Sequence, residues 1–373
     1  MEGKNCKRIG HIDIPGGGQV VAQGKQAFIG HMKSPHGTSI VDLSDLKHPR
    51  LVSTIEIPEG THSHKARVRG DIMMINVEKH GHSSQPFQGG LKIYDISKPQ
   101  KPREIAFFKT GGKGVHRFTI DERYAYISTE VEGYLRNITM IVDLTDPEKP
   151  EEVGRWWMPG QWIAGGEKPT WEGGRIFTHH PLRLKDRLYA GMRYGGLAII
   201  DISNLRQPKM IGRLNWNDSY ANSVHTTLPI PFKIRNRSWL FVTEEDSTDE
   251  IYEDPSASVW MVDITAEHQP VSVETFRVPD GDFVKLRRRF GAHQPAEQVK
   301  GTVIPVAWFC AGVRFVDISD PYQLTEVGYF IADPCGGEKV TQSNDVYIDD
   351  QGLIYLMDRY CGLDILEYTG SWN

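Results

Sequence analysis

The sequence has little cysteine and no long apolar run. Only four of the 373 residues are cysteines, far apart and without a CxxC pair, so we expect reduced thiols and no zinc ribbon or dithiol redox motif. They are Cys6, Cys310, Cys335 and Cys361. No stretch of 18 apolar residues occurs, and the opening MEGKNCKRIG lacks the apolar segment of a secretion signal. We therefore expect a cytoplasmic protein that has no membrane as partner.

An excess of positive charge is also missing. The chain carries 43 Lys and Arg against 48 Asp and Glu, a net charge of −5 with neutral histidines, so nothing electrostatic favours a nucleic acid as partner. The GxSxG, P-loop, HExxH and EF-hand patterns are absent, which removes the usual sequence signs of several hydrolase, nucleotide-binding and metal-binding classes. The 37 glycines and 22 prolines argue against an all-helical bundle.

One motif recurs along the chain at intervals of 48 to 62 residues. Each copy is a short β-branched run, a polar step such as Asp-Ile-Ser, and a segment that is usually rich in proline, so each predicts a strand followed by a turn. The copies read SIVDLSD, KIYDISK, MIVDLTD, AIIDISN, WMVDITA and RFVDISD, with the aspartate at Asp42, Asp95, Asp143, Asp201, Asp263 and Asp317. A degenerate seventh copy, LDILEY, has Glu367 there. We expect each aspartate to accept backbone hydrogen bonds where its strand ends.

Four short strands per repeat predict an all-β fold, a seven-bladed β-propeller with four antiparallel strands in each blade. The segment KRIGHIDIPGG reads as a fourth strand with no blade before it, and the last repeat ends after its third strand. We therefore expect residues 1–14 to complete blade 7 and close the ring of a single domain, residues 1–373. The expected blades are residues 15–60, 61–112, 113–160, 161–218, 219–280, 281–335 and 336–373.

The repeat resembles that of the LVIVD-repeat proteins, a loosely defined family of bacterial seven-bladed propellers. The resemblance rests on IVDLSD, IYDISK, IVDLTD, IIDISN, MVDITA and FVDISD and extends over essentially the whole chain. It implies architecture and says almost nothing about chemistry.

A histidine recurs at the start of the first strand in five of the seven blades. The five are His64, His116, His180, His225 and His293, while blade 7 has Asn344 and blade 1 has Gly18. Histidine makes up only 14 of 373 residues, so the repetition is not accidental. One interpretation is a structural histidine that hydrogen-bonds within each blade, as in WD-type propellers. The other is that the imidazoles converge on the propeller axis and hold one metal ion, since neutral imidazole is a common ligand.

Glutamates at a second repeated position favour the metal. Glu78 and Glu130 each follow their histidine by 14 residues, and Glu244 takes the same place in blade 5. A hairpin would bring such a carboxylate to the end of the blade where the histidine lies. There it could accept the second N–H of a ligand histidine, as outer-shell carboxylates do. A solvated rim of glutamates is the alternative.

Histidines backed by glutamates on a seven-bladed propeller are similar to the site of the carotenoid-cleavage oxygenases. Those enzymes are non-haem iron(II) dioxygenases with four histidines and three glutamates, so the resemblance implies an Fe(II) centre. A looser similarity is to methanethiol oxidase of the selenium-binding-protein family, also a metal-dependent propeller. Both likenesses concern the constellation of side chains, and neither implies a particular substrate.

Other polar residues fall near the expected pocket. Arg193 or Arg359 could bind a substrate carboxylate, and Tyr194 could donate a proton because it replaces the repeated glutamate in blade 4. His62, His179 and Asp345 lie next to the repeated histidines in sequence. The histidine-rich segment around His80 and His82 is interpreted as a surface loop.

The sequence as a whole predicts a metal-dependent enzyme with an all-histidine centre on the propeller axis. We expect one transition-metal ion, Fe(II) ahead of Cu, Mn or Zn, and an oxidoreductase or dioxygenase reaction on a small organic substrate with O2 as co-substrate. Two alternatives stay open: a hydrolase or lyase that uses the same metal as a Lewis acid, and a non-catalytic interaction propeller with structural histidines. A homo-oligomer is compatible with each of these functions.

Overall fold

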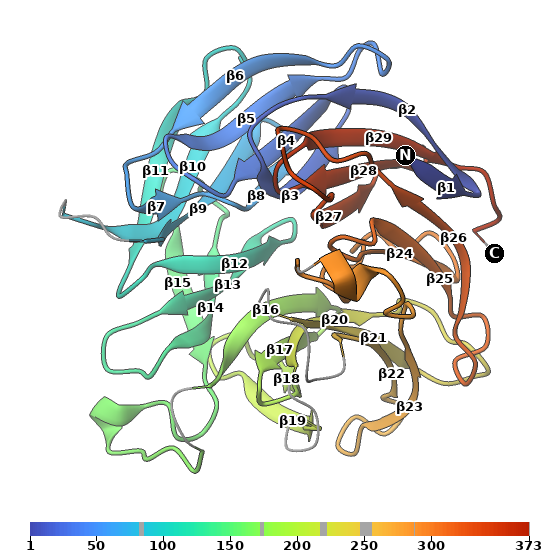
Figure 1. Cartoon of the computed structure of the whole chain (residues 1–373). Helices are drawn as coiled ribbons and strands as arrows, with labels where there is room; N and C mark the ends of the chain where they lie inside the picture. The colour runs from blue at the N-terminus through green and yellow to red at the C-terminus, as the bar shows by residue number, and fades with distance from the viewer. Residues whose placement is uncertain (82–85, 172–174, 217–221, 247–255, 287, 373) are drawn as a thin grey trace.

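The computed structural model describes residues 1–81, 86–171, 175–216, 222–246, 256–286 and 288–372. Its sheets stand around a central axis like the blades of a fan, and the chain passes once around the ring, so β2 (Cys6–Ile12) lies beside the last strand, β29 (Gly362–Tyr368) (Figure 1). Within these ranges the helical segments are two short 3-10 turns, η1 (Ile163–Gly165) and η2 (Phe283–Leu286). The predicted seven-bladed, all-β propeller is confirmed.

Blades 1 to 3 are consecutive antiparallel sheets. Blade 1 contains β3 (Gly17–Gln23), β4 (Gln26–His31), β5 (His36–Asp42) and β6 (Arg50–Glu56). Blade 2 contains β7 (Thr61–His62), β8 (Ala66–Arg69), β9 (Ile72–Lys79), β10 (Gly89–Asp95) and β11 (Arg103–Thr110). Blade 3 contains β12 (Val115–Ile120), β13 (Tyr124–Glu130), β14 (Asn137–Asp143) and β15 (Glu151–Trp156).

Blades 4 and 5 are joined into one sheet by a single pairing of Arg193 with Val224. Blade 4 contains β16 (Ile176–Leu184), β17 (Arg187–Arg193), β18 (Leu197–Asp201) and β19 (Lys209–Leu214). Blade 5 contains β20 (Ser223–Pro229), β21 (Trp239–Glu245), β22 (Val259–Asp263) and β23 (Val271–Phe276).

Blade 6 departs from the regular pattern at both edges. It contains β24 (Val303–Ala307), β25 (Val313–Asp317) and β26 (Thr325–Ile331), and β1 (Glu2–Lys4) is added outside β26. The axial edge is an irregular segment rather than a regular strand. There the His293 N–H donates to the Ala307 carbonyl at 3.0 Å, and the Ala296 N–H donates to the Pro305 carbonyl at 2.8 Å.

Blade 7 is completed by the beginning of the chain. Its sheet contains β27 (Ser343–Ile348), β28 (Leu353–Asp358), β29 (Gly362–Tyr368) and β2 (Cys6–Ile12), in the order β2-β29-β28-β27. Cys6 pairs with Tyr368 at one end of the contact, and Ile12 pairs with Leu363 at the other. The ring is therefore closed by the N-terminal strand, as the orphan strand in the sequence predicts.

The repeated aspartates end their strands as expected. Each accepts a hydrogen bond from the backbone N–H two residues later, at 2.8 to 2.9 Å. The donors are Ser44, Ser97, Thr145, Ser203, Thr265 and Ser319. This local bond competes with the strand ladder and turns the chain, so the motif positions strands rather than substrate.

The core lies between blades. Each blade packs against a neighbour on both faces, so successive residues of a strand are buried although their side chains point in opposite directions. On β13, Ala125, Tyr126 and Ile127 are all fully buried. Tyr126 packs toward blade 4, and Ile127 shares a cluster with Ile93 of blade 2. Interlocking of this kind holds the axial edges of the blades at fixed positions.

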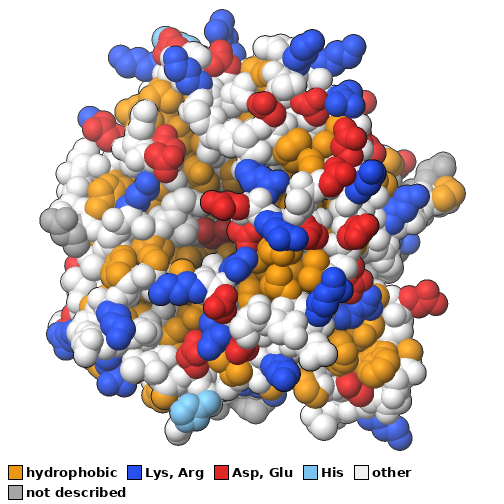
Figure 2. Space-filling model, turned by 180° about the vertical axis from the view of Figure 1, so that it is seen from behind, with side chains coloured by type: hydrophobic (Ala, Val, Ile, Leu, Met, Phe, Trp, Pro, Cys, Tyr) orange, Lys and Arg blue, Asp and Glu red, His pale blue; other side chains and the backbone are white. Residues whose placement is uncertain are grey.

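Two cysteines form a disulfide bond that the sequence analysis does not predict. Cys335 is bonded to Cys361, whereas Cys6 and Cys310 are free thiols. The expectation of four reduced thiols is wrong for this pair, because the fold brings the segment between β26 and β27 against the β28–β29 turn of blade 7. Within the described ranges no helix is long and apolar enough to cross a membrane. On the face shown in Figure 2, basic and acidic side chains are interspersed.

Candidate metal centre

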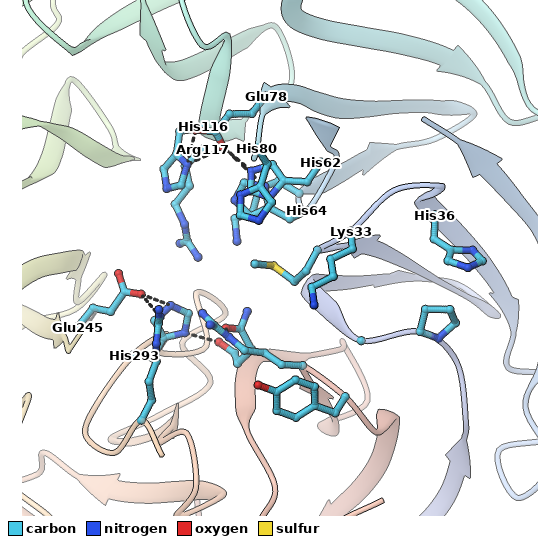
Figure 3. A pocket seen from close by; sticks show the side chains of 18 of the residues that line it. Lys33, His36, His62, His64, Glu78, His80, His116, Arg117, Glu245 and His293 are labelled. Carbon is cyan, nitrogen blue, oxygen red and sulfur yellow. Dashed lines mark hydrogen bonds and ion pairs between the residues drawn. The ribbon is translucent and has the colours of Figure 1, made fainter. Parts of the chain in front are cut away.

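A polar cavity of about 820 Å³ lies where the axial edges of the blades converge. Figure 3 shows side chains from several blades pointing into it. Its wall includes eight histidines, the three glutamates Glu78, Glu245 and Glu338, and a set of lysines and arginines. The histidines are His36, His62, His64, His80, His116, His179, His225 and His293.

Seven of these imidazoles form a continuous series of ring contacts, which we call the histidine arc. The arc runs in the order His80, His62, His64, His116, His179, His225 and His293. Neighbouring ring centres are 3.9 to 5.2 Å apart. The arc therefore joins blades 2 to 6 around one side of the axis.

Irregular pairing at the start of the axial strands of blades 3, 4 and 5 turns the arc residues of these blades inward. Pairing of β12 with β13 skips His116 and resumes at Arg117, and pairing of β20 with β21 skips His225. On β16 the pairing passes from Ile176 directly to His180, so His179 is among the residues that it skips. A bulged residue is free of the ladder and its side chain is re-aimed, which is why bulges are common beside active sites.

This geometry corrects the sequence prediction for blade 4. His179, not His180, occupies the position equivalent to His116 and His225. His180 does not line the cavity; it lies deeper on the axis, where its Nδ1 accepts a hydrogen bond from Arg117 at 2.9 Å. His64, His116, His225 and His293 do line the cavity, as predicted.

Protein acceptors fix the Nδ1 atoms of four arc histidines. His116 Nδ1 donates to both oxygens of Glu78 at 2.8 and 2.9 Å. His179 Nδ1 donates to the His225 carbonyl at 2.9 Å, and His225 Nδ1 donates to Thr226 Oγ1 at 2.8 Å. His293 Nδ1 donates to the carbonyl of Asn344. In all four rings Nε2 is thereby left as the lone-pair nitrogen, which is how proteins orient histidine ligands.

The closest approach in the arc suits a metal ion. Nε2 of His116 and Nε2 of His179 are 3.0 Å apart. Two imidazole nitrogens that bind one ion at about 2.0–2.1 Å each, with an angle near 90°, lie roughly 3 Å apart. Potential ligand atoms of His179, His225 and Glu245 also lie within 4.8 Å of one another, as do those of His62, His64, Glu78 and His116. These buried His/Glu groups could bind metal.

Burial sets the protonation states that a metal requires. It lowers the pKa of His64, His179 and His225 well below the ordinary value, so these rings are neutral at pH 7. Burial lowers the pKa of His116 as well, although Glu78 acts in the opposite direction. For Glu78 itself, burial raises the pKa, but His116 and His62 outweigh that effect and hold the pKa well below its usual range.

Of the three predicted glutamates, the structure brings only Glu78 to the histidines. It backs His116 of the next blade and accepts a second bond from His62 Nε2 at 2.6 Å. Glu130 turns away and accepts the Lys113 N–H at 2.8 Å. Glu244 also points away, bonding Trp216 Nε1 at 2.8 Å and the Ser258 N–H at 2.9 Å, and burial raises its pKa to about 7.

The carboxylate that lines the cavity in blade 5 is Glu245. It lies 2.6 Å from Arg193 Nη1, 3.4 Å from Arg289 Nη1 and 3.7 Å from His293 Nε2. Burial raises its pKa, but Arg193 and His293 hold it well below the usual range. Adjacent residues of a strand face opposite sides of the sheet. An alignment of the repeats that is wrong by one residue therefore selects Glu244, which points away, instead of Glu245, which lines the cavity.

The three residues proposed for substrate chemistry have different positions. Arg193 and Arg359 line the cavity, but Arg193 is paired with Glu245, and Arg359 Nε donates to Asn344 Oδ1 at 2.7 Å. Tyr194 is not part of the cavity wall, and its ring lies 3.9 Å from the Arg175 guanidinium. The role of Tyr194 as proton donor to a substrate is therefore not supported by its position.

Sequence reasoning also missed residues of the wall. His80 stacks on His62 with a ring separation of 4.4 Å and belongs to the site rather than to a remote surface loop, whereas His82 lies outside the described residues. Lys65 and Arg117 follow the arc residues His64 and His116 and form a second, deeper tier. The sequence contains a sign of this deeper tier, because the residue after each repeated axial position is polar. The tier consists of Gln19, Lys65, Arg117, His180, Thr226, Gln294 and Asp345, all buried.

Comparisons with known proteins support the architecture. Residues 187–215 match the family described as LVIVD repeat, and no curated protein matches the sequence. The computationally designed Ika8 protein is 8% identical, with a TM-score of 0.55 over 96% of this chain and 98% of that one. The RRP9 WD40 repeats are 10% identical, with a TM-score of 0.60 over 97% and 96%.

A third structural relative is a chain from a complex of S. cerevisiae Dbp5 bound to Nup159, Gle1, IP6 and ADP. It is 12% identical, with a TM-score of 0.60 over 97% of this chain and 94% of that one. At such identities the likeness shows a shared propeller fold and nothing about activity. The comparisons give no support for a relation to the carotenoid-cleavage oxygenases.

Proposed function

We propose that the protein is a metal-dependent oxidoreductase whose transition-metal ion is held by the Nε2 atoms of His116, His179, His225 and His293. The observation that carries the proposal is the common orientation of these rings. Each has its Nδ1 bonded to a protein acceptor: the Glu78 carboxylate, the carbonyls of His225 and Asn344, and the Thr226 hydroxyl. Histidines that only stabilised their own blades would not all have to orient the same unprotonated nitrogen, Nε2, toward one cavity.

The donor set favours a borderline transition metal. Imidazole without thiolate suits iron, copper and zinc more than calcium or magnesium, and we propose Fe(II). When bound, such an ion supplies Lewis acidity and one-electron redox chemistry. The chain's own contribution is orientation and charge: Glu78 fixes the His116 ring, and Glu245 faces His293 while balancing Arg193.

Metal analysis of protein purified without an affinity tag tests the proposal. We expect close to one transition-metal ion per chain. His179→Gln should lose the metal, whereas His180→Gln, altered one residue along the same strand, should keep it. Equal occupancy in both variants, or an unmodified protein that binds no metal under any metal supplement, would reject the centre and favour an interaction propeller.

Oxygen consumption tests the redox part separately. The metal-loaded protein is offered small organic substrates in air and under argon. Turnover that stops under argon supports an oxygen-dependent oxidoreductase. Turnover that persists without O2 would replace redox chemistry by Lewis-acid hydrolysis or elimination at the same ion.

A further inference from the structure

Two basic side chains of the deeper tier have donors with no acceptor. Arg117 is 1% exposed; its Nη1 donates to Gln294 Oε1 and to His180 Nδ1, but its buried Nη2 has no hydrogen-bond partner in the described structure. Lys65 is 2% exposed and makes no side-chain hydrogen bond with a described residue, although the buried Asp345 carboxylate acts on it electrostatically. Both side chains line the cavity, and Figure 3 shows the Arg117 guanidinium pointing into it. Buried cationic donors left without acceptors are costly, so they mark a place where a ligand supplies the acceptor.

His64 presents a third donor, because its tautomer differs from that of the proposed ligands. Asn76 is fixed by two backbone bonds: its Oδ1 accepts the Lys65 N–H at 2.8 Å, and its Nδ2 donates to the Val115 carbonyl at 2.9 Å. The same Nδ2 therefore donates to His64 Nδ1, at 3.2 Å. A neutral ring that accepts at Nδ1 carries its proton on Nε2. His64 is 3% exposed, and its Nε2–H has no partner among the described residues, so it serves the cavity as a donor rather than as a metal ligand.

The balance of charge in the wall points the same way. The cavity is lined by eight Lys and Arg residues but by only three Glu residues. The basic residues are Lys33, Lys65, Lys79, Lys113, Arg117, Arg193, Arg289 and Arg359. The whole chain, in contrast, has a net charge of −5. Glu245 is engaged by Arg193 and Arg289, and the excess of basic over acidic side chains in the wall creates a positive potential that attracts anions.

We propose that His64 Nε2, Lys65 Nζ and Arg117 Nη2 form an oxyanion subsite beside the metal centre, and that the substrate is a small organic carboxylate. Lys65 and His64 are consecutive residues, and Arg117 follows the proposed ligand His116, so the subsite adjoins the ion. The cavity of about 820 Å³ exceeds the needs of an inorganic oxyanion and includes Pro15, Met32 and Tyr360, against which an organic body can pack. Identifying the carboxylate as substrate rests on the proposed metal-dependent function, whereas the subsite itself does not need the metal.

Calorimetric titration of the full-length, chelator-treated protein separates these questions. The probes are benzoate, its neutral analogue benzamide, and inorganic phosphate. Benzoate should bind, benzamide should bind at least about tenfold more weakly, and Lys65→Met should weaken benzoate by roughly tenfold or more, because a charge-assisted hydrogen bond is lost. The matched control is Lys79→Met, which removes an exposed charge from the same wall and should cost less than about threefold.

A second pair of variants protects the test if Lys65→Met folds poorly. His64→Gln retains an N–H donor and should keep most of the affinity, whereas His64→Leu should lose it. Equal binding of benzoate and benzamide, equal effects of Lys65→Met and Lys79→Met, or phosphate binding without benzoate binding would each overturn the proposal. Benzoate binding by a protein that proves unable to bind metal would refute the proposed function while leaving the subsite intact.

Discussion

Replacing Glu78 should weaken the metal centre, although this carboxylate is not expected to touch the ion. Glu78 accepts His116 Nδ1 at 2.8 and 2.9 Å and His62 Nε2 at 2.6 Å, so Glu78→Ala frees both rings to rotate. Loss of an outer carboxylate typically costs about 10- to 100-fold in metal affinity. That corresponds to roughly 1.4–2.7 kcal/mol. Glu78→Gln should cost less, because its amide oxygen can still accept one of these bonds.

The repeat supplies matched controls for this experiment. Glu130 occupies the equivalent position in blade 3, and Glu244 lies one residue before the equivalent Glu245 in blade 5, but neither Glu130 nor Glu244 faces the arc. Glu130→Ala and Glu244→Gln should therefore leave metal affinity within about twofold, as measured by competition against a chromophoric chelator. Glutamine is chosen at Glu244 because it can keep the bond to Trp216. Our account of the site would be refuted by equal losses at Glu78 and Glu130, or by no loss at Glu78.

Three further outcomes follow from the same geometry. The double variant His116→Ala, His225→Ala should contain no stoichiometric metal by elemental analysis; full occupancy would show that the arc is not the centre. Deleting residues 1–12 should expose the edge of β29, lower the melting temperature and cause aggregation detectable by light scattering, so an unchanged melting temperature would contradict ring closure by β2. Finally, metal-free protein should lose stability as the pH falls below about 6.5, because burial lowers the pKa of arc residues such as His179 and His225 in the folded state, and the unfolded chain then binds more protons. Each such histidine contributes up to about 1.4 kcal/mol per pH unit, so urea denaturation with a flat profile between pH 7 and 5 would exclude neutral buried rings.

The fold could be predicted from sequence because its determinants are local and repeated. Every copy of the motif around residues such as Asp42 and Asp95 specifies a strand, an aspartate-capped turn and a new strand within a few residues. Six such copies, with a degenerate seventh that has Glu367 in place of the aspartate, leave few arrangements other than a ring. Even the pairing of β2 with β29 could be predicted, because the N-terminal strand has no blade of its own and blade 7, at the other end of the sequence, lacks its fourth strand.

The site was predictable only to within one residue. Its general place and His64, His116, His225, His293 and Glu78 were found from the repeat, but bulges and strand register decide which neighbour turns toward the axis. In blade 4 the irregular pairing turns His179 toward the cavity instead of the predicted His180. In blade 5 the strand register turns Glu245 toward the cavity instead of the predicted Glu244. The proton position on His64 depends on Asn76, a residue 12 positions away whose own bonds are set by the fold. The pairing of Cys335 with Cys361 likewise needs the tertiary arrangement, because nothing in their spacing specifies it.

The pairing of Cys6 with Tyr368 also fixes the order in which the molecule can be built. The ribosome makes β2 before blades 1 to 6 but makes its partner β29 after them, so β2 has no ladder to join while those blades emerge. Contacts between such distant segments carry a large loop-closure cost and form slowly. The arc histidines come from blades 2 to 6 and can gather before that contact exists, whereas Asn344, which orients His293, arrives with blade 7. Completion of the proposed metal centre and closure of the ring therefore belong to the same late stage of folding.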